Sequence, residues 1–330
     1  MHKDIVLGPK MTLDEFVEVA RCGSKVEFSE EYAGRVEKTR RLVDGWAEEG
    51  GVMYCITTGF GVLCTKTISK EENAKLQRNI ILTHSVSVGE PLSIEQTRAV
   101  MLMVLQNAGQ DYSGIRLEVL EMYRQFLNLG LTPFAPQEGS VGYLNIEAHI
   151  ALVLIGKGKA YIKGELLPAR EALDKIGLKP IELSSKEGLV LVKKPGLNSG
   201  LMIPQYSQAG ILNDMRILCH PATIDNIPTC GNQEDYVSMG YNACKKGILV
   251  AEKLEYILAI ELLSVYQAHQ FIQEGLEPGT VTKAVLEEIK SKVPVMEEDM
   301  YLHPYIEELK DIIHSGRIID LVEEKVGKLV

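Results

Sequence analysis

A loop from Pro133 to Gly142 is the stretch of this chain that is best suited to carry chemistry. It reads Pro-Phe-Ala-Pro-Gln-Glu-Gly-Ser-Val-Gly and leads into a segment, 143–155, whose apolar residues recur at helical spacing. The prolines fix the backbone angle φ, and the glycines allow a tight turn or a close approach. Because the first N–H groups of a helix lack partners within it, a rigid loop ahead of a helix can offer donors to a ligand. A plain connection between helices has the same pattern, so the loop does not decide the function by itself.

Three side chains elsewhere have the chemistry of a proton-transfer or binding site. Tyr54 precedes a Thr-Thr-Gly-Phe-Gly turn, and a phenol can act as a general base when its neighbours lower its pKa. His84 lies near the end of a predicted helix, where a lone histidine is more often structural. Glu234 precedes the longest predicted helix, and the helix dipole favours a carboxylate there whether or not it has another role. Each of the three therefore has a structural explanation beside the functional one.

Several stretches resemble, in family order, the motifs of the histidine and aromatic amino-acid ammonia-lyases. They are Tyr54-Cys-Ile-Thr-Thr-Gly-Phe-Gly61, Leu76-Gln-Arg-Asn-Ile-Ile-Leu-Thr-His84, Glu138-Gly-Ser-Val-Gly142, Pro195-Gly-Leu-Asn-Ser-Gly-Leu-Met-Ile-Pro-Gln205, His220-Pro-Ala-Thr-Ile-Asp225 and Gly231-Asn-Gln-Glu-Asp-Tyr-Val-Ser-Met239. The resemblance covers nearly the whole chain. It implies elimination of ammonia from an amino acid to give an α,β-unsaturated acid, an elongated helical bundle of the ammonia-lyase and fumarase-like type, and a homo-oligomer, which is a tetramer in the family.

The resemblance also implies roles for the three side chains. Tyr54 matches the tyrosine that takes the β-proton of the amino acid. Thr83-His84 is similar to a Ser-His pair that contacts the substrate in members acting on histidine. Glu234 matches a glutamate that can hydrogen-bond an imidazole in the same members. His84 and Glu234 therefore both favour histidine, or a related aromatic amino acid, as the substrate.

The chain departs from the family pattern at the place of the prosthetic group. Family members carry an Ala-Ser-Gly triad that cyclises into the electrophilic methylidene-imidazolone group (MIO), whereas here Gly142 is followed directly by Tyr143. Three explanations are open: the triad is absent, a processed group was left out of the written sequence, or the loop holds a different chemistry with Tyr143 near the substrate. The resemblance assigns Gly142 and Tyr143 to the catalytic position and Asn145 to substrate binding. The cofactor is MIO if the triad was left out, and otherwise none; no metal site is predicted.

A second departure lies between Val192 and Pro195, where the chain has only Lys193-Lys194. The family has a long central helical segment there, with further catalytic residues that include an arginine for the substrate carboxylate. Loss of such a segment should leave apolar side chains uncovered, and we expect Ile260, Leu262 and Leu263 to be among them.

Apolar periodicity predicts a mainly α protein. Capping boxes and periodic runs predict helices at 12–21, 29–49, 69–83, 93–106, 115–129, 184–192, 201–220 and 236–273, and over 280–330 with a break around Pro294 and Pro304. A β-hairpin is predicted at 160–167 with its turn at Gly164, and a short extended piece at 52–57. We expect two domains: 1–194, lyase-like with the Gly-Ser-Val-Gly loop, and 195–330, a helical region with the long bundle helix.

Composition narrows the class of protein. Hydrophobic residues make up 45% of the 330 and charged residues 24%, as in ordinary globular proteins, and the net charge of −10 argues against a nucleic-acid partner. The six cysteines form no Cys-x-x-Cys pair, so free thiols in a reducing cytoplasm are expected. No signal peptide and no membrane span are predicted from the hydropathy pattern.

Two functions of different classes remain. The first is an ammonia-lyase, with MIO as the electrophile and Tyr54 as the base. The second is a non-catalytic or shortened lyase-like scaffold, which binds a small amino acid or pairs with another chain that supplies the missing part. The intact mass of the protein would show whether a processed group lies between Gly142 and Tyr143 or is truly absent.

Overall fold

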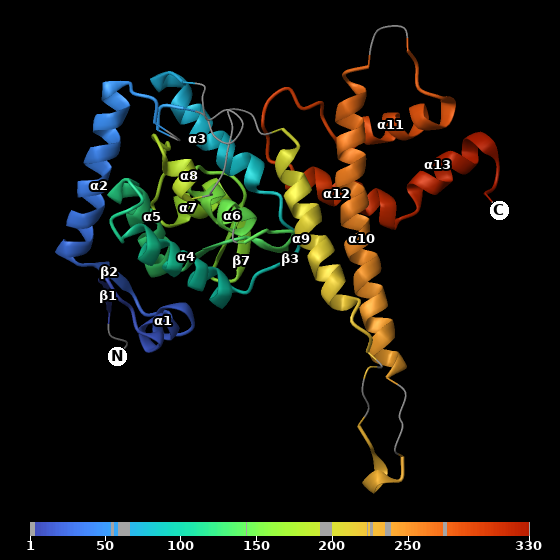
Figure 1. The fold of residues 1–330 in the computed structure, drawn as a ribbon, viewed down its shortest axis with the longest axis horizontal. Helices are drawn as coiled ribbons and strands as arrows, with labels where there is room; N and C mark the ends of the chain where they lie inside the picture. The colour runs from blue at the N-terminus through green and yellow to red at the C-terminus, as the bar shows by residue number, and fades with distance from the viewer. Residues whose placement is uncertain are drawn as a thin grey trace. The chain divides into compact units, whose positions relative to one another are not determined.

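We describe the fold from a computed structural model of the chain, which divides into two compact units. The described residues are 4–53, 56–58, 67–142, 144–191, 200–222, 224, 227–234, 239–272 and 276–329. Unit 1 comprises residues 1–203 together with Glu298–Tyr301, and unit 2 comprises 204–297 and 302–330. Helices predominate in both units (Figure 1). The predicted domain boundary at 194/195 falls within 192–199, outside the described residues, and stays a prediction.

Eight helices belong to the described part of unit 1. They are α1 (Leu13–Ala20), α2 (Glu30–Glu49), α3 (Lys70–His84), α4 (Ile94–Ala108), α5 (Leu117–Leu129), α6 (Leu144–Leu154), α7 (Ala169–Lys175) and α8 (Glu187–Leu191). Thr12, Ser69 and Ser93 each begin a helix with a reciprocal capping box. Because such caps are set by residues only three apart, the starts of these helices match the sequence prediction.

The core of unit 1 is built around α6. Its residues Ile150–Leu154 are all fully buried, and α3, α4 and α7 pack against this helix (Figure 1). A helix that is apolar on every side is favoured only where neighbours cover it completely. The glycine-rich loop at its N-terminus is therefore anchored to the most buried element of the unit.

Seven short strands complete the described part of unit 1. β1 (Ile5–Leu7) pairs in parallel with β2 (Val26–Phe28), and β3 (Val88–Pro91) pairs antiparallel with β5 (Pro136–Glu138). β4 (Leu131–Pro133), β6 (Lys159–Ile162) and β7 (Glu165–Pro168) form an antiparallel sheet in the order β4-β6-β7. The predicted hairpin with its turn at Gly164 is confirmed as β6–β7. Strands of three residues are too short to show a period of two, and β1–β5 were not predicted.

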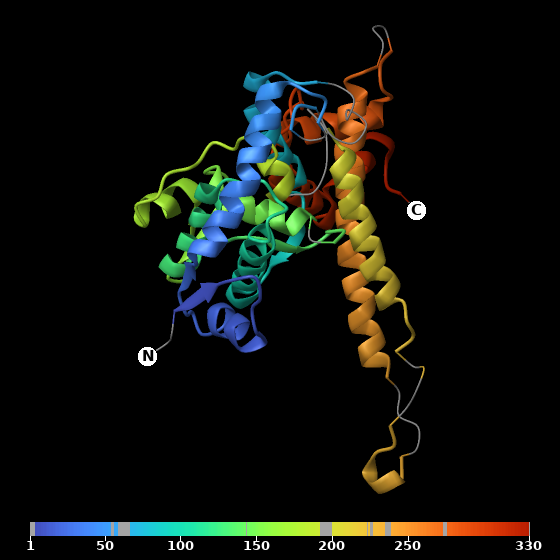
Figure 2. The ribbon, with the colours of Figure 1, turned by 60° about the vertical axis from the view of Figure 1, so that its left-hand side comes forward.

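Unit 2 is a set of helices packed along one long helix. Its elements are α9 (Met202–Leu218), which begins at the unit boundary, a 3₁₀ turn (Cys230–Asn232), α10 (Gly240–His269), α11 (Thr280–Lys292), α12 (His303–His314) and α13 (Arg317–Val326). Figure 2 shows α9 running beside α10. The side-chain amide of Gln208 donates to the carbonyl of Ile257 at 3.0 Å, which ties the two helices together. α12 also packs on α10, where the Tyr256 hydroxyl donates to Glu307 at 3.1 Å.

The mainly α fold is confirmed, and the long bundle helix is found at 240–269. The predicted break around Pro294 and Pro304 is confirmed, since α11 ends at Lys292 and α12 begins at His303. Pro304 lies in the first turn of α12, where a proline needs no N–H partner. Other local expectations were wrong. Ile56 and Thr57 form a turn, not an extended piece. Ile260 and Leu263 are buried.

Gly188 shows how tightly α8 packs on α3. A Cβ on this glycine would lie 2.4 Å from the backbone oxygen of Gln77 and 2.9 Å from its Cα. Atoms of a helix backbone cannot yield as a side-chain end can, so α8 would have to move.

Replacing Gly188 by alanine should therefore lower the free energy of unfolding by about 1–3 kcal/mol, as overpacking of a core does. Gly45 in α2 is the matched control, since a Cβ there meets no atom within 4 Å. Gly45→Ala should raise stability by about 0.5–1 kcal/mol because alanine is the better helix former. Urea denaturation of both variants tests this, and equal effects of the two would contradict it.

Candidate active site

His84 is the last residue of α3 and is fully buried. Its Nδ1 lies 2.8 Å from the carbonyl oxygen of Ile80 and 3.1 Å from the hydroxyl oxygen of Thr83. A carbonyl only accepts, so Nδ1 carries the proton and Nε2 has the lone pair. Among the residues that the structure describes, this buried Nε2 has no hydrogen-bond partner. A buried acceptor without a partner costs about 1–3 kcal/mol, so a donor from a ligand would be stabilising here.

The charge state of His84 follows from its burial. Burial lowers the pKa of the imidazole from 6.5 to about 4, and the hydrogen bond to Ile80 opposes this shift without cancelling it. His84 is therefore neutral at pH 7. Its chemistry is that of a hydrogen-bond acceptor, not that of a cation or a proton donor at Nε2.

Strand pairing brings the segment after His84 beside the glycine-rich loop. The chain leaves α3 at His84 and enters β3 at Val88, which pairs with Glu138 of β5. Glu138 begins the Glu-Gly-Ser-Val-Gly run, and the helix after that run, α6, packs against α3. The backbone thus places two predicted parts of the site side by side, although they are far apart in sequence. The functional roles of the residues stay predictions.

The glycine-rich loop is closed by hydrogen bonds within itself. The side-chain amide of Asn145 donates to the carbonyl of Gly139 at 2.7 Å, and its backbone N–H donates to the Ser140 hydroxyl at 3.2 Å. Ser140 in turn donates to the carbonyl of Gly142 at 3.1 Å. Gly142 has φ of +66°, a left-handed conformation that suits glycine. Asn145 is fully buried, and its amide nitrogen ties α6 to the loop through the bond to Gly139.

The described loop residues do not fit an MIO group. That group would form from an Ala-Ser-Gly triad, whereas the serine of this loop, Ser140, is followed by Val141 and its hydroxyl bonds within the loop. α6 begins at Leu144, so only one residue separates Gly142 from the helix. In the sequence as printed, the described residues of this loop offer no electrophile of the predicted kind.

Tyr54 and Tyr143, two of the predicted catalytic residues, lie outside the described residues. The neighbours of Tyr54 in the chain are described. The carbonyl of Met53 accepts from the N–H of Ile56 at 3.1 Å and from that of Thr57 at 3.0 Å. The Thr57 hydroxyl oxygen accepts from the N–H of Met53 at 2.9 Å. These bonds join the described residues that precede and follow the tyrosine in the chain.

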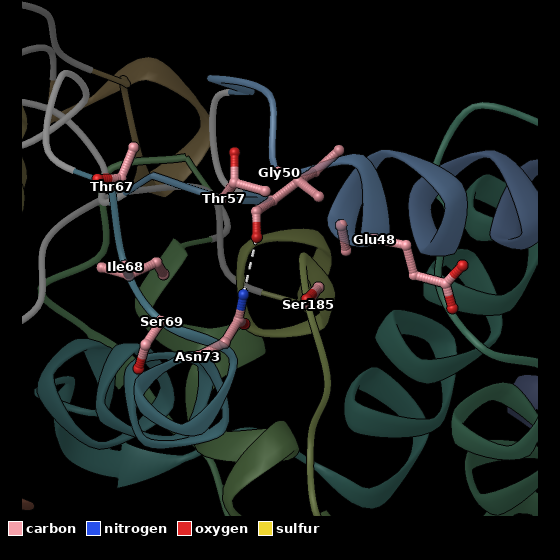
Figure 3. A pocket seen from close by; sticks show the side chains of 10 residues that line it. Glu48, Gly50, Thr57, Thr67, Ile68, Ser69, Asn73 and Ser185 are labelled. Carbon is pink, nitrogen blue, oxygen red and sulfur yellow. Dashed lines mark hydrogen bonds between the residues drawn. The ribbon is translucent and has the colours of Figure 1, made fainter.

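A cavity of about 240 Å³ lies beside this turn, between the end of α2 and the start of α3 (Figure 3). Its lining is mixed, with Ala47, Ile56 and Ile68 beside hydroxyl, amide and carboxylate groups. The polar lining side chains are Glu48, Thr57, Thr67, Ser69, Asn73 and Ser185. The turn that follows Tyr54 in the chain therefore borders open space within unit 1.

Glu234 belongs to unit 2. It is exposed, and its carboxylate accepts from the Thr229 hydroxyl at 2.8 Å. The backbones of the same two residues also pair, with the Thr229 N–H 2.9 Å from the Glu234 carbonyl. Glu234 lies ahead of α10 and outside its first turn, so it does not cap that helix. Its place beside His84 stays a prediction.

The sequence analysis missed an ion-pair cluster around Glu187, which is fully buried at the start of α8. Its carboxylate accepts from Arg116 Nε and Nη2, both at 2.8 Å, and from the Ser184 N–H at 2.7 Å. Arg40 approaches the same carboxylate to 3.7 Å. Arg40 and Arg116 also line a second cavity of about 500 Å³. Because the partners are distant in sequence, no local motif signals this cluster.

The helical fold, the buried histidine and the loop ahead of α6 agree with the ammonia-lyase resemblance of the sequence. The family described as aromatic amino acid lyase matches residues 11–193 and 190–291. The chain belongs to this family. The family and the class of enzyme predicted from the motifs are thereby confirmed.

Curated relatives extend over nearly the whole chain. The chain is 28% identical to histidine ammonia-lyase 1 of Fusobacterium nucleatum over 508 positions, which cover 99% of the chain and 98% of that protein. It is also 28% identical to histidine ammonia-lyase of Symbiobacterium thermophilum over 505 positions, with 98% and 99% covered. Both alignments are much longer than the 330 residues of the chain. Since the two family matches meet at 190–193, a long internal stretch of the relatives has no counterpart here.

Solved structures show the same fold. Histidine ammonia-lyase of Trypanosoma cruzi aligns with a TM-score of 0.55 and 22% identity, covering 98% of this chain and 95% of that one. The ergothioneine-degrading enzyme ergothionase of Treponema denticola aligns with a TM-score of 0.57 and 18% identity, covering 96% and 100%. At these identities the likeness concerns the fold alone.

Among the described residues, no group of three or more histidine, cysteine, aspartate or glutamate side chains could hold a metal ion. No helix formed by these residues is long and apolar enough to cross a membrane.

Proposed function

We propose that this protein is an ammonia-lyase-type protein for histidine or a closely related aromatic amino acid. The observation that carries this proposal is the Nε2 atom of His84, a buried acceptor without a partner in the described part of the chain. An imidazole or ammonium N–H of such a substrate is the kind of donor that would pair with it. The curated relatives named histidine ammonia-lyase support the same substrate class.

The proposed roles use groups of this chain. Tyr54 would take the β-proton as a general base, and His84 would hold the substrate through Nε2 while staying neutral. Glu234 would bond the imidazole of the substrate. Gly142, Tyr143 and Asn145 would form the loop that faces the reacting amino acid. In the family an MIO group supplies the electrophile, and the described loop gives no support for it in the printed sequence.

A second function is favoured by two observations. The triad for the electrophile is missing from the sequence, and the aligned relatives are far longer than the chain. Both fit a non-catalytic scaffold that binds a small amino acid, or one that pairs with another chain that supplies the missing part. Binding of histidine without turnover would favour this alternative.

We also propose a homo-oligomer in the cytoplasm. Several large apolar side chains on α9 and α10 are exposed, among them Ile217, Ile248 and Leu254. Apolar surfaces of this kind are usually covered by a partner. Cys22, Cys219, Cys230 and Cys244 are free thiols, which suits a reducing compartment. A monomer in analytical ultracentrifugation at micromolar concentration would contradict the assembly.

Turnover and intact mass, measured on the same preparation, test the proposed activity. A general base contributes about 10²–10⁴-fold to a rate, whereas enzymes reach about 10⁶-fold or more. If the mass equals that of the printed sequence, turnover of histidine, phenylalanine and tyrosine should therefore be negligible, because no electrophile is present. If the mass is larger by a dehydrated Ala-Ser-Gly unit, turnover should appear and prefer histidine. The assay is the ultraviolet absorbance of the unsaturated acid.

The variant His84→Leu removes the acceptor and tests its role in the same assay. It should abolish the preference for histidine over phenylalanine in an active preparation. Clear formation of the unsaturated acid by a protein of the printed mass would refute the argument about the electrophile. A preference for phenylalanine would refute the argument about His84.

A further inference from the structure

Three hydrogen bonds in series join α8, α3 and the turn that follows Met53. The N–H of Gly188 donates to Oε1 of Gln77 at 2.8 Å. Nε2 of Gln77 donates to Oδ1 of Asn73 at 3.1 Å, and Nδ2 of Asn73 donates to the carbonyl of Ile56 at 2.8 Å (dashed in Figure 3). Gln77 and Asn73, at 0% and 7% exposure, are both buried. We call this series the amide relay.

The relay has a fixed direction. Its first member is a backbone N–H, which only donates, and its last is a backbone carbonyl, which only accepts. A flip of either side-chain amide would therefore place two donors or two acceptors against each other. Buried mismatches of this kind are costly, so the two amides are held in one orientation.

The turn held by the relay is the one that carries Tyr54 in the sequence. The carbonyl of Ile56 is the acceptor at the end of the relay, and the Ile56 N–H bonds to Met53 on the other side of the tyrosine position. Asn73 also lines the cavity of about 240 Å³ with Ile56 and Thr57. The relay thus physically links α8 to two stretches that carry family motifs, the tyrosine turn and the helix that ends at His84.

We infer that Asn73 and Gln77 are positioning residues for the turn at Ile56 and Thr57, two and three residues after Tyr54 in the sequence, and that they act on the base through the chain. The part of this inference that concerns Tyr54 rests on the proposed function. The two amides act through the backbone carbonyl of Ile56. Gly188 is the α8 end of the relay, and its close packing on the backbone of Gln77 leaves no space for a Cβ there.

Isosteric acid variants break single bonds of the relay. Asn73→Asp keeps the acceptor for Gln77 and loses the donor for Ile56. Gln77→Glu keeps the acceptor for Gly188 and loses the donor for Asn73. Gln106→Glu is the matched control, because Gln106 is similarly buried, at 8% exposure, and its amide donates to the carbonyl of Gly8 at 3.2 Å.

Amide hydrogen exchange of the full chain is the first measurement. Loss of one buried hydrogen bond should make exchange at Ile56 and Thr57 about tenfold faster in Asn73→Asp. Gln77→Glu should have a smaller effect of the same sign, and Gln106→Glu none at these two amides. The three variants are compared at equal global stability, set by urea. Unchanged exchange at Ile56 and Thr57 in Asn73→Asp and Gln77→Glu would overturn the inference.

The second measurement is a comparison of kcat with KM in a preparation that turns over histidine. A misplaced base slows the reaction without weakening substrate binding, so kcat of Asn73→Asp should fall by about tenfold while KM stays within about twofold. A rise in KM at constant kcat would overturn the link to Tyr54. A wild-type protein without turnover contradicts the proposed function alone, and the exchange result then still decides whether the relay positions the turn.

Discussion

Glu187→Ala is expected to lower the free energy of unfolding by about 3–5 kcal/mol. The variant would leave Arg116, whose side chain is 29% exposed, without its bidentate partner, and would leave buried Arg40 with Asp44 as its carboxylate partner. The N–H of Ser184 would also lose its acceptor. A buried charge that loses its partner keeps its desolvation cost, and this is why breaking such a pair is far more damaging than the pair is stabilising. Urea denaturation followed by circular dichroism measures the change.

Glu118→Ala is the control for this prediction. Glu118 pairs with the same arginine, at 3.0 Å from Nη1, but its side chain is 63% exposed. Exposed pairs are worth about 0–1 kcal/mol, so this variant should be close to the wild type. If the free energy of unfolding of Glu187→Ala also stays within about 1 kcal/mol of the wild type, the ion-pair cluster does not stabilise the fold as the geometry indicates.

Acidification should destabilise the protein through His84. The folded state holds its pKa at about 4 because the imidazole is buried, whereas the ordinary value is 6.5. Between these two values the unfolded chain binds a proton that the folded chain does not, so stability falls as the pH is lowered through this window. A shift of this size corresponds to about 3 kcal/mol, fully lost at pH 4 and below.

The measurement is the free energy of unfolding of the wild type and of His84→Leu from pH 7 to pH 4. The difference between the two proteins should change by about 3 kcal/mol over that range, with the wild type losing more. His314→Asn removes an exposed histidine that pairs with Glu255 and controls for the loss of an imidazole. A constant difference between the wild type and His84→Leu would show that His84 is not buried as described.

Local signals in the sequence predicted much of this fold. The starts of α1, α3 and α4 follow from capping residues, and the ends of α2 and α5 follow from Gly50 and Gly130, both with positive φ. Strands of three or four residues lack a readable period, and only the hairpin around Gly164 had a turn signal strong enough to be found. The start of α8 also differed, since Ser184 was expected to begin the helix and Glu187 does.

The candidate site was predictable only in part. The motif resemblance singled out His84 and the loop at Gly142, and strand pairing brings their segments together. The free acceptor on His84 could not be predicted, because it depends on what surrounds the ring. Asn73 and Gln77 were missed for the same reason: the bond from Gly188 to Gln77 joins residues 111 positions apart. Glu234 remains a sequence-based prediction.

The position of α8 has a consequence for how this chain could have changed in length. The family matches break at 190–193, directly after this helix, and α8 is locked onto α3 at Gly188. A change in chain length at that joint follows α8 in the chain and leaves the packing of α8 on α3 in place. The central part of such a protein can therefore be replaced while the described residues up to Leu191 keep their packing.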